Sequence, residues 1–279
     1  MRSRVTGKMI SVKIGTAERR KTMKRLPRGL KTIDVAMPLY LKGDNRGILV
    51  IHGFTGSPHE MRYLAHRLHE AGFSVSVPRL PGHGTCSEDF LNVEARDWIR
   101  RAMDSYFDLK GVHDKVGIVG LSMGGLIATI IAAQFEVDSL VLAAPAFHVS
   151  DKRIKFVPLM RFFRKKITRD PSRIPDVQEN LENIRKEYWM WDWIAPGYQF
   201  MKVRKLALKS LKYLKCPTFI IASRKDTTVP IDGVLKVFNK IPTSQKEMLT
   251  LNESAHVVVN NVEKELVANR IIEWFSKTL

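Results

Sequence analysis

The sequence predicts an α/β protein in which a mostly parallel sheet is covered by helices on both faces. Short apolar runs with the length of buried strands alternate along the chain with longer helix-like stretches, and this alternation is typical of parallel sheets. The 279 residues are 44% hydrophobic, so the chain can bury one full core. The alternation breaks once, after residue 146, and we therefore expect one α/β domain that carries an insert.

The expected elements follow one another from residue 47 onward. Strands are predicted at 47–52, 73–78, 116–120, 138–144, 217–223 and 246–251. Helices are predicted at 58–71, 94–110, 123–135 and 261–277, with one more between the last two strands. Trp98 lies in the second of these helices, and we interpret it as a core residue.

Ser122 lies between a predicted strand and a predicted helix, in the segment Gly120-Leu121-Ser122-Met123-Gly124. A serine in this context occupies a sharp, strained turn that exposes its hydroxyl. The flanking glycines are needed because a side chain there would crowd the strand or the helix. The alternative is an ordinary tight turn. The β-branched run before Ser122 and the apolar helix after it favour a catalytic nucleophile.

A nucleophilic serine needs a general base and an acid that orients the base, in the chain order Ser, Asp or Glu, His. Asp226 follows the strand predicted at 217–223, and His256 follows the strand predicted at 246–251. Both therefore lie at the carboxyl edge of the sheet, where sites on open α/β sheets form. We predict Asp226 as the acid and His256 as the base; Asp232 competes as the acid but falls at the start of the next helix. Six further histidines have structural explanations on a polar helix face, in loops or in a turn: His59, His66, His69, His83, His113 and His148.

A developing oxyanion requires two backbone N–H donors, one from the residue after the nucleophile and one from the loop after an earlier strand. The strand predicted at 47–52 leads into His52-Gly53-Phe54-Thr55-Gly56. The predicted donors are therefore the amides of Phe54 and Met123. A plain turn after the strand is the alternative, and in the catalytic interpretation His52 supports the loop.

These segments make the chain resemble the α/β-hydrolase superfamily, and more narrowly the small bacterial carboxylesterases and monoacylglycerol lipases. The resemblance is carried by five segments, which are residues 52–56, 79–85 and 120–125 and the blocks around Asp226 and His256. The insert matches the family poorly. The resemblance implies an α/β-hydrolase fold with a helical cap insert. It assigns the nucleophile to Ser122, the acid to Asp226, the base to His256 and the oxyanion donors to Phe54 and Met123. In the family, the Pro81-Gly82-His83-Gly84 turn forms a wall of the site. The chain departs from the family at Ala255, where glycine is common, and in lacking a long opening β-hairpin.

The predicted domain organisation has three parts. They are a basic N-terminal extension at 1–33, a hydrolase core formed by 34–146 and 213–279, and a cap insert at 147–212. The insert is rich in aromatic residues, and we interpret Trp189, Trp191 and Trp193 as candidates for substrate binding, because acyl pockets are lined by apolar and aromatic groups. The alternative for each ring is that it only packs the cap onto the core.

The net charge of +18 is concentrated in two segments. Residues 1–31 hold eleven Lys or Arg and one acidic residue, and residues 151–215 hold seventeen against seven. Positive fields attract anionic partners such as lipid headgroups. We expect weak association with anionic membrane surfaces through the cap and the N-terminus, and no specific nucleic-acid partner. A solvated surface or the Lys/Arg enrichment of a heat-adapted protein is the alternative.

The two cysteines, Cys86 and Cys216, lie in unrelated segments and predict reduced thiols in a cytoplasmic protein. The basic start is not followed by the apolar stretch of a signal peptide, and no apolar run is long enough to predict a membrane span. We find neither metal-ligand spacing nor a phosphate-binding glycine loop, so we expect no metal and no cofactor.

The predicted function is a serine carboxylesterase that hydrolyses small-molecule esters of short to medium acyl chains through an acyl-enzyme. Alternatives that use the same triad are a monoacylglycerol lipase, a thioesterase and an acyltransferase. Epoxide hydrolases and dehalogenases are disfavoured, because their nucleophile would be Asp where this chain has Ser122. A non-enzymatic binding module is the least expected, since it would not need the nucleophile, base, acid and oxyanion loop together.

Overall fold

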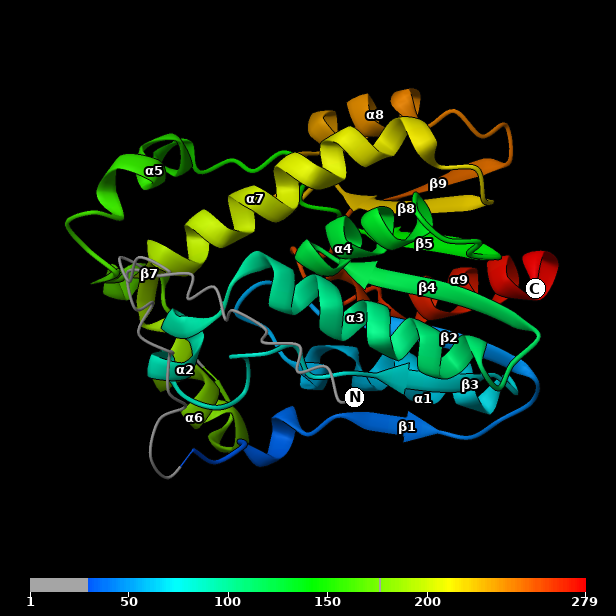
Figure 1. The fold of residues 1–279 in the computed structure, drawn as a ribbon, viewed down its shortest axis with the longest axis horizontal. Coiled ribbons are helices and arrows are strands. Elements are labelled where there is room, and N and C mark those ends of the chain that lie inside the picture. Colours follow the sequence, from blue (N-terminus) through cyan, green and yellow to red (C-terminus); the bar gives the residue numbers. More distant parts are fainter. Residues whose placement is uncertain (1–29, 176) are drawn as a thin grey trace, which may run out of the picture.

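The computed structural model describes residues 30–175 and 177–279 (Figure 1). The basic extension predicted at 1–33 lies outside the described residues except for its last four positions. Cys86 and Cys216 are both free cysteines in this structure. Among the helices of the described residues, none has the length and hydropathy of a membrane-spanning segment.

A seven-stranded sheet forms the centre of the molecule, in the order β1-β3-β2-β4-β5-β8-β9. Its strands are β1 (Leu39–Leu41), β2 (Arg46–Ile51), β3 (Ser74–Val77), β4 (Lys115–Leu121), β5 (Ser139–Ala143), β8 (Thr218–Ser223) and β9 (Lys246–Leu251). β1 pairs antiparallel with β3, and the other pairs in this sheet are parallel. The predicted parallel sheet is therefore confirmed. The edge strand β1 was not predicted, because three residues are too short to show a strand period.

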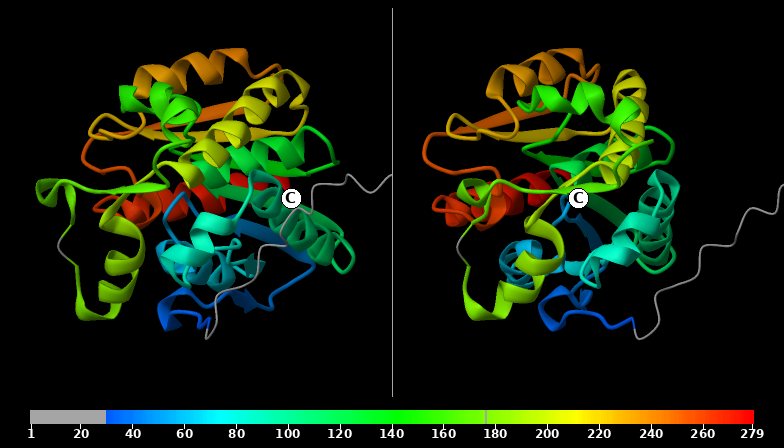
Figure 2. Two further views of the ribbon diagram at one scale, coloured as in Figure 1. Left: turned by 60° about the vertical axis from the view of Figure 1, so that its left-hand side comes forward. Right: turned by 90° about the vertical axis from the view of Figure 1, so that its left-hand side faces the viewer.

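Helices cover both faces of the sheet (Figures 1 and 2). α1 (Arg62–Glu70) and α9 (Lys264–Thr278) pack on one face. The other face is covered by α3 (Ala95–Lys110), α4 (Met123–Ala132), α7 (Ala195–Ser210) and α8 (Ile231–Lys240). Along β4, Ile118 and Val119 belong to the core clusters on opposite faces, which explains why the strand reads as one continuous apolar run.

Several predicted boundaries need correction. The helix predicted at 58–71 consists of a 3-10 turn at Pro58–Met61, with proline at its first position, followed by α1 at Arg62–Glu70. The helix predicted at 123–135 ends at Ala132, and the last helix starts at Lys264 rather than at 261. The short helix α2 (Ser87–Asn92) was not predicted. Trp98 is completely buried, as predicted.

The segment between β5 and β8 holds α5 (Val157–Met160), α6 (Glu182–Ile184), α7 and a small separate sheet of β6 (Lys166–Thr168) and β7 (Trp191–Trp193). Its α5, α6 and β7 lie at the end of the molecule where the parallel strands finish, and α7 runs from there along the sheet (Figure 1). The buried residues of α7, such as Val203 and Ala207, belong to the same core cluster as α4. Packing is therefore continuous across residue 212, and the boundary at 212 stays a prediction.

Candidate active site

The turn between β4 and α4 holds Ser122 in an unusual backbone conformation. Its φ of 54° and ψ of −112° lie outside the regions that residues other than glycine normally adopt. A Cβ at Gly120 would lie 2.3 Å from the Gly124 carbonyl oxygen, and a Cβ at Gly124 would lie 2.2 Å from the Ile51 carbonyl oxygen. Both glycines are therefore required by close backbone contacts, and these contacts hold the strained turn in place.

Asp226 follows β8, at the carboxyl edge of the sheet. Its Oδ1 accepts hydrogen bonds from the amides of Thr228 at 2.8 Å and Val229 at 2.9 Å. Its Oδ2 accepts from His256 Nδ1–H at 2.7 Å. The carboxylate is almost completely buried, with 1% of the side chain exposed. The two amides leave one oxygen of the carboxylate directed at the imidazole.

His256 lies between Asp226 and Ser122, and its Nε2 is 2.9 Å from Ser122 Oγ. The structure therefore brings the three predicted residues into one chain of hydrogen bonds, although the histidine is 134 positions from the serine. Asp232 is exposed in the first turn of α8, and its carboxylate makes neither a hydrogen bond nor an ion pair with His256.

Glu263 fixes the loop that carries His256, a role that the sequence did not reveal. Its carboxylate accepts from the amides of Glu253 at 3.0 Å and Ser254 at 2.8 Å, and from Ser254 Oγ at 2.7 Å. Ser223 Oγ at the end of β8 donates to the Ser254 carbonyl. The His256 loop is therefore held to the strand end that precedes Asp226.

The loop after β2 lies against the serine turn. A Cβ at Gly53 would be 3.4 Å from Ser122 Cβ, which places the next residue, Phe54, beside the turn, with Met123 as the first residue of α4. His52 is completely buried. Its Nδ1–H donates to the Gly53 carbonyl at 3.0 Å, and its Nε2 accepts from the Leu80 amide at 3.1 Å. Burial lowers the pKa of His52 to about 3, so the ring is neutral, and its predicted supporting role is confirmed.

A carboxyl group lies under the same loop, and sequence reasoning missed it. A Cβ at Gly56 would fall 2.0 Å from Glu60 Oε2, and this oxygen is buried with no hydrogen-bond partner among the described residues. Burial raises the pKa of Glu60 to about 7, against the opposing effect of the Gly53 amide. The only sequence signal was a charged residue one turn after the loop, which is normally exposed.

Aromatic side chains form the wall beside the site. The Phe54 ring lies 5.4 Å from Phe90 and 5.5 Å from Phe200, measured between ring centroids. The Tyr188 hydroxyl donates to the Gly82 carbonyl at 2.9 Å and accepts from the Thr85 amide at 2.7 Å. The 81–84 turn is therefore attached to the insert through one buried tyrosine.

The three candidate tryptophans have different surroundings. Trp189 Nε1 donates to the Thr55 carbonyl at 3.1 Å, in the loop beside Ser122. Trp191 lies under the Lys166 ammonium, which is 3.5 Å from its ring centroid. Trp193 is 6% exposed, and its ring centroid lies 4.9 Å from that of Phe90. One of the three, Trp189, therefore contacts the loop beside the serine.

His59 differs from the expectation of a polar helix face. It lies in the 3-10 turn before α1, with its ring centroid 6.0 Å from that of Trp189. Its Nδ1 is 2.7 Å from Ser57 Oγ, and burial lowers its pKa to about 4. The prediction was wrong because the insert covers this turn, which the local sequence could not indicate.

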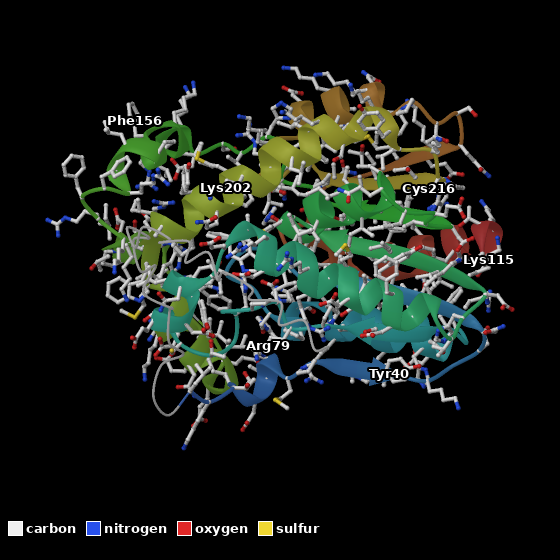
Figure 3. All side chains as sticks on the ribbon, viewed as in Figure 1. Tyr40, Arg79, Lys115, Phe156, Lys202 and Cys216 are labelled. Carbon is white, nitrogen blue, oxygen red and sulfur yellow. The ribbon has the colours of Figure 1, made fainter. Side chains whose placement is uncertain are left out.

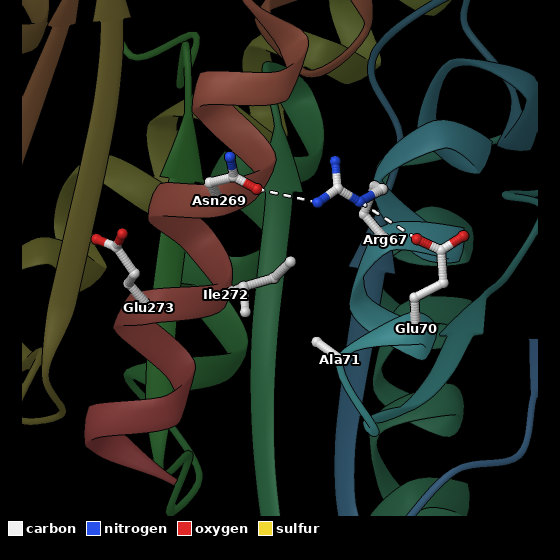
Figure 4. Close-up of a pocket in the computed structure, with 6 residues that line it drawn as sticks. All are labelled: Arg67, Glu70, Ala71, Asn269, Ile272 and Glu273. Atoms are coloured by element: carbon white, nitrogen blue, oxygen red, sulfur yellow. Dashed lines mark hydrogen bonds and ion pairs between the residues drawn. The ribbon is translucent and has the colours of Figure 1, made fainter.

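A surface recess of about 360 Å³ lies between α1 and α9, away from the triad (Figure 4). Its charged groups pair with their neighbours: Arg67 donates to Asn269 Oδ1 at 3.0 Å and lies 3.3 Å from Glu70. None of the predicted site residues lines it, and we assign it no catalytic role.

Comparison with known proteins identifies the family. Residues 44–263 match the family model described as serine aminopeptidase, S33. The chain is 29% identical to a thermostable monoacylglycerol lipase of Bacillus sp. (strain H-257), over 87% of this chain and 95% of that protein. It is 22% identical to a carboxylesterase of Bacillus subtilis (strain 168), over 86% and 96%. A solved structure from work on the metagenome-derived lipolytic enzymes LipS and LipT superposes with a TM-score of 0.80, at 29% identity, and covers 88% of this chain and 100% of that chain. Because the family model matches most of this chain, the chain belongs to the serine aminopeptidase S33 family of α/β-hydrolases.

Proposed function

We propose that this chain is a serine hydrolase of carboxylic esters in which Ser122 is the nucleophile, His256 the general base and Asp226 the orienting acid. The observation that carries the proposal is the continuous path of hydrogen bonds from Asp226 Oδ2 through the imidazole to Ser122 Oγ. Both distances are within the range needed for proton transfer and orientation.

In the first step, His256 Nε2 accepts the Ser122 proton while Oγ attacks the ester carbonyl carbon. The C–O bond to the alcohol then breaks, and the alcohol leaves with the proton from His256. Ser122 retains the acyl group as an ester. In the second step, His256 takes a proton from water, the hydroxide attacks the acyl carbon, and the acid leaves as Ser122 Oγ regains its proton.

Asp226 does not take part in the proton transfers of this cycle. Its role is to hold the imidazole in the tautomer with hydrogen on Nδ1 and to stabilise the imidazolium that forms. The amides of Thr228 and Val229 fix the carboxylate in this orientation. A fixed carboxylate needs no reorganisation when the charge develops.

The amides of Phe54 and Met123 are the proposed donors to the oxyanion of each tetrahedral intermediate. The contact between Gly53 and Ser122 supports this role, since it brings the loop after β2 against the nucleophile turn. Met123 is at the N-terminus of α4, where backbone N–H groups have no partner within the helix.

The proposed substrates are small-molecule esters with short to medium acyl chains, and the aromatic rings beside the site would contact the acyl or alcohol group. Hydrolysis of monoacylglycerols is the second candidate, supported by the similarity to the Bacillus monoacylglycerol lipase. Thioester hydrolysis and acyl transfer use the same triad and stay as alternatives. The cytoplasmic location predicted from the sequence is part of the proposal.

Two measurements test this function. A fluorophosphonate probe should label the protein at Ser122, and Ser122→Ala should abolish labelling and lower ester hydrolysis about a million-fold with the fold retained by circular dichroism. Labelling of a different serine would overturn the assignment.

The substrate class is tested by one panel at equal enzyme concentration. The panel contains p-nitrophenyl esters from acetate to palmitate, monoacylglycerols, an acyl thioester and an aminoacyl p-nitroanilide. We expect the highest kcat/KM on a short to medium ester. A preference for monoacylglycerols would select the second candidate, and a preference for the anilide would replace ester hydrolysis by aminopeptidase activity.

A further inference from the structure

The outer end of the insert carries a concentration of exposed apolar side chains. We call residues 152–168 the outer tip. Phe156, Leu159, Phe162 and Phe163 are 63%, 64%, 72% and 77% exposed. The positions 156, 159 and 163 are three and four residues apart, which is the spacing of one helical face. Figure 3 shows Phe156 at the outer end of the molecule. Four large exposed apolar side chains within eight residues form a denser group than the scattered apolar residues of an ordinary protein surface.

The opposite side of the outer tip is fixed to the rest of the protein. Val157 is 7% exposed, and its Cγ1 would be 3.9 Å from a Cβ at Gly197 in α7. The Arg161 guanidinium lies 3.9 Å from the ring centroid of Tyr198 in α7. The tip is therefore held by its inner side. On its outer side, the Arg161 guanidinium lies 4.7 Å from the Phe162 ring centroid, and the four apolar side chains stay largely exposed.

Positive charge surrounds these apolar side chains. Residues 152–168 contain seven Lys or Arg and no acidic residue. Arg153 is neutralised by Asp151 at 2.7 Å and Asp192 at 3.1 Å. The exposed cations without an ion pair to any residue in the described ranges are Lys152, Lys155, Arg161, Arg164 and Lys165.

We propose that the outer tip docks the protein on a bilayer that contains anionic phospholipid, with the phenylalanine rings inserted at the level of the headgroups. Aromatic rings beside lysine and arginine are the composition of interfacial membrane anchors. Each basic residue near an anionic surface adds attraction that salt screens. The surface is small, so the binding it supports is reversible.

Charge favours a lipid surface over two other occupants of this surface. A second copy that docked through its own tip would bring the same seven basic residues and no acidic one. The chain's own residues 1–31 hold eleven Lys or Arg against one acidic residue, so they too would be repelled. A lipid surface supplies the negative charge and the apolar interior at the same place.

Docking and ester hydrolysis can be measured separately, so the proposal stands independently of the substrate. The part of the insert that holds α5 and β7 lies at the carboxyl edge of the sheet (Figure 1), the edge that holds Ser122. A docked tip would therefore hold this edge near the lipid surface.

Vesicle cosedimentation with the full-length protein tests the proposal. The wild type should bind vesicles of phosphatidylcholine mixed with phosphatidylglycerol more tightly than vesicles of phosphatidylcholine alone, and the binding should weaken as salt is added. The double variant Phe162→Ser, Phe163→Ser should bind the mixed vesicles about tenfold more weakly. The control is Val112→Ser, which removes a side chain that is 68% exposed in the loop before β4; its affinity should equal that of the wild type.

A charge-reversal pair tests the electrostatic part. Lys155→Glu with Arg164→Glu should weaken binding more than Lys236→Glu with Lys240→Glu, which changes the same charge on α8. Hydrolysis of a soluble acetate ester by all four variants should match the wild type, which shows that the site is intact. Wild-type affinity of the phenylalanine variant for mixed vesicles would overturn the proposal. A change in its sedimentation mass in place of its vesicle affinity would assign the tip to contact between two copies instead.

Discussion

The turn that carries Ser122 and the insert that lies beside it are held in place by different kinds of contact. At the turn, backbone atoms touch so closely that Gly120 and Gly124 have no room for a Cβ. In the insert, side chains make many of the long-range contacts, as where Tyr188 binds the 81–84 turn and Trp189 binds the Thr55 carbonyl. Backbone packing fixes the proposed reacting atoms within narrow limits, whereas side-chain contacts allow the neighbouring surface to vary.

The largest effects are expected at the hydrogen-bonded triad. His256→Ala should remove nearly all ester hydrolysis, and Asp226→Asn should cost less, about 10⁴-fold in kcat, because the acid orients the base without transferring a proton. Steady-state kinetics on one p-nitrophenyl ester compares the two. Asp232→Asn is the control, since this residue is exposed on α8, and its activity should be that of the wild type. An inactive Asp232→Asn together with an active Asp226→Asn would require a different acid.

Two glycine substitutions compare the regions directly. Gly124→Ala places a Cβ 2.2 Å from the Ile51 carbonyl oxygen and should destabilise the fold by several kcal/mol. Gly197→Ala in α7 places a Cβ no nearer than 3.9 Å to its neighbours and should stabilise the fold by about 0.5–1 kcal/mol, because alanine favours the helix. Urea unfolding measures both. Equal tolerance at the two positions would contradict the contrast between backbone and side-chain packing.

Glu60 should make the stability of the loop region depend on pH. Its pKa is raised by burial from 4.5 to about 7 in the folded protein, so its contribution to stability is fully present below pH ~4.5 and is lost as pH rises through ~7. The loss is on the order of 3 kcal/mol. Glu60→Gln keeps the shape but cannot ionise, so its unfolding free energy should fall less than that of the wild type between about pH 5 and 8. The control Glu70→Gln, exposed at the end of α1, should keep the wild-type dependence, and an unchanged slope in Glu60→Gln would show that the carboxyl is ionised throughout.

The smallest effects are expected at the tryptophans of the insert. Trp189→Ala should shift the preferred acyl length, with changes of about tenfold or less in relative kcat/KM and little change on acetate esters. Trp193→Ala should mainly lower thermal stability, because the ring is buried against Phe90. An ester series from acetate to palmitate measures the profile, with the exposed Tyr40→Ala on β1 as control. If the variants at Trp189, Trp191 and Trp193 all keep the wild-type profile, these rings only pack the insert.

Much of the site could be predicted because its parts follow strand ends. The apolar runs indicated the parallel strands, and Ser122, Asp226 and His256 follow three of them at one edge of the sheet. A strand-to-helix turn with glycines on both sides also restricts the backbone locally. The element boundaries were less certain, since helix ends such as Ala132 depend on packing as well as on the local sequence.

The sequence by itself determined the alternation of the six parallel strands with the main helices and the residues proposed for the chemistry, because both depend on short-range periodicity and on backbone restrictions. The tertiary structure alone decided that the Glu60 carboxyl is buried under the loop after β2, that Tyr188 attaches the 81–84 turn to the insert, and that the three tryptophans have separate surroundings. The reason is physical: Tyr188 and Thr85 are 103 positions apart, and whether such side chains meet depends on how whole elements pack, which no local pattern specifies.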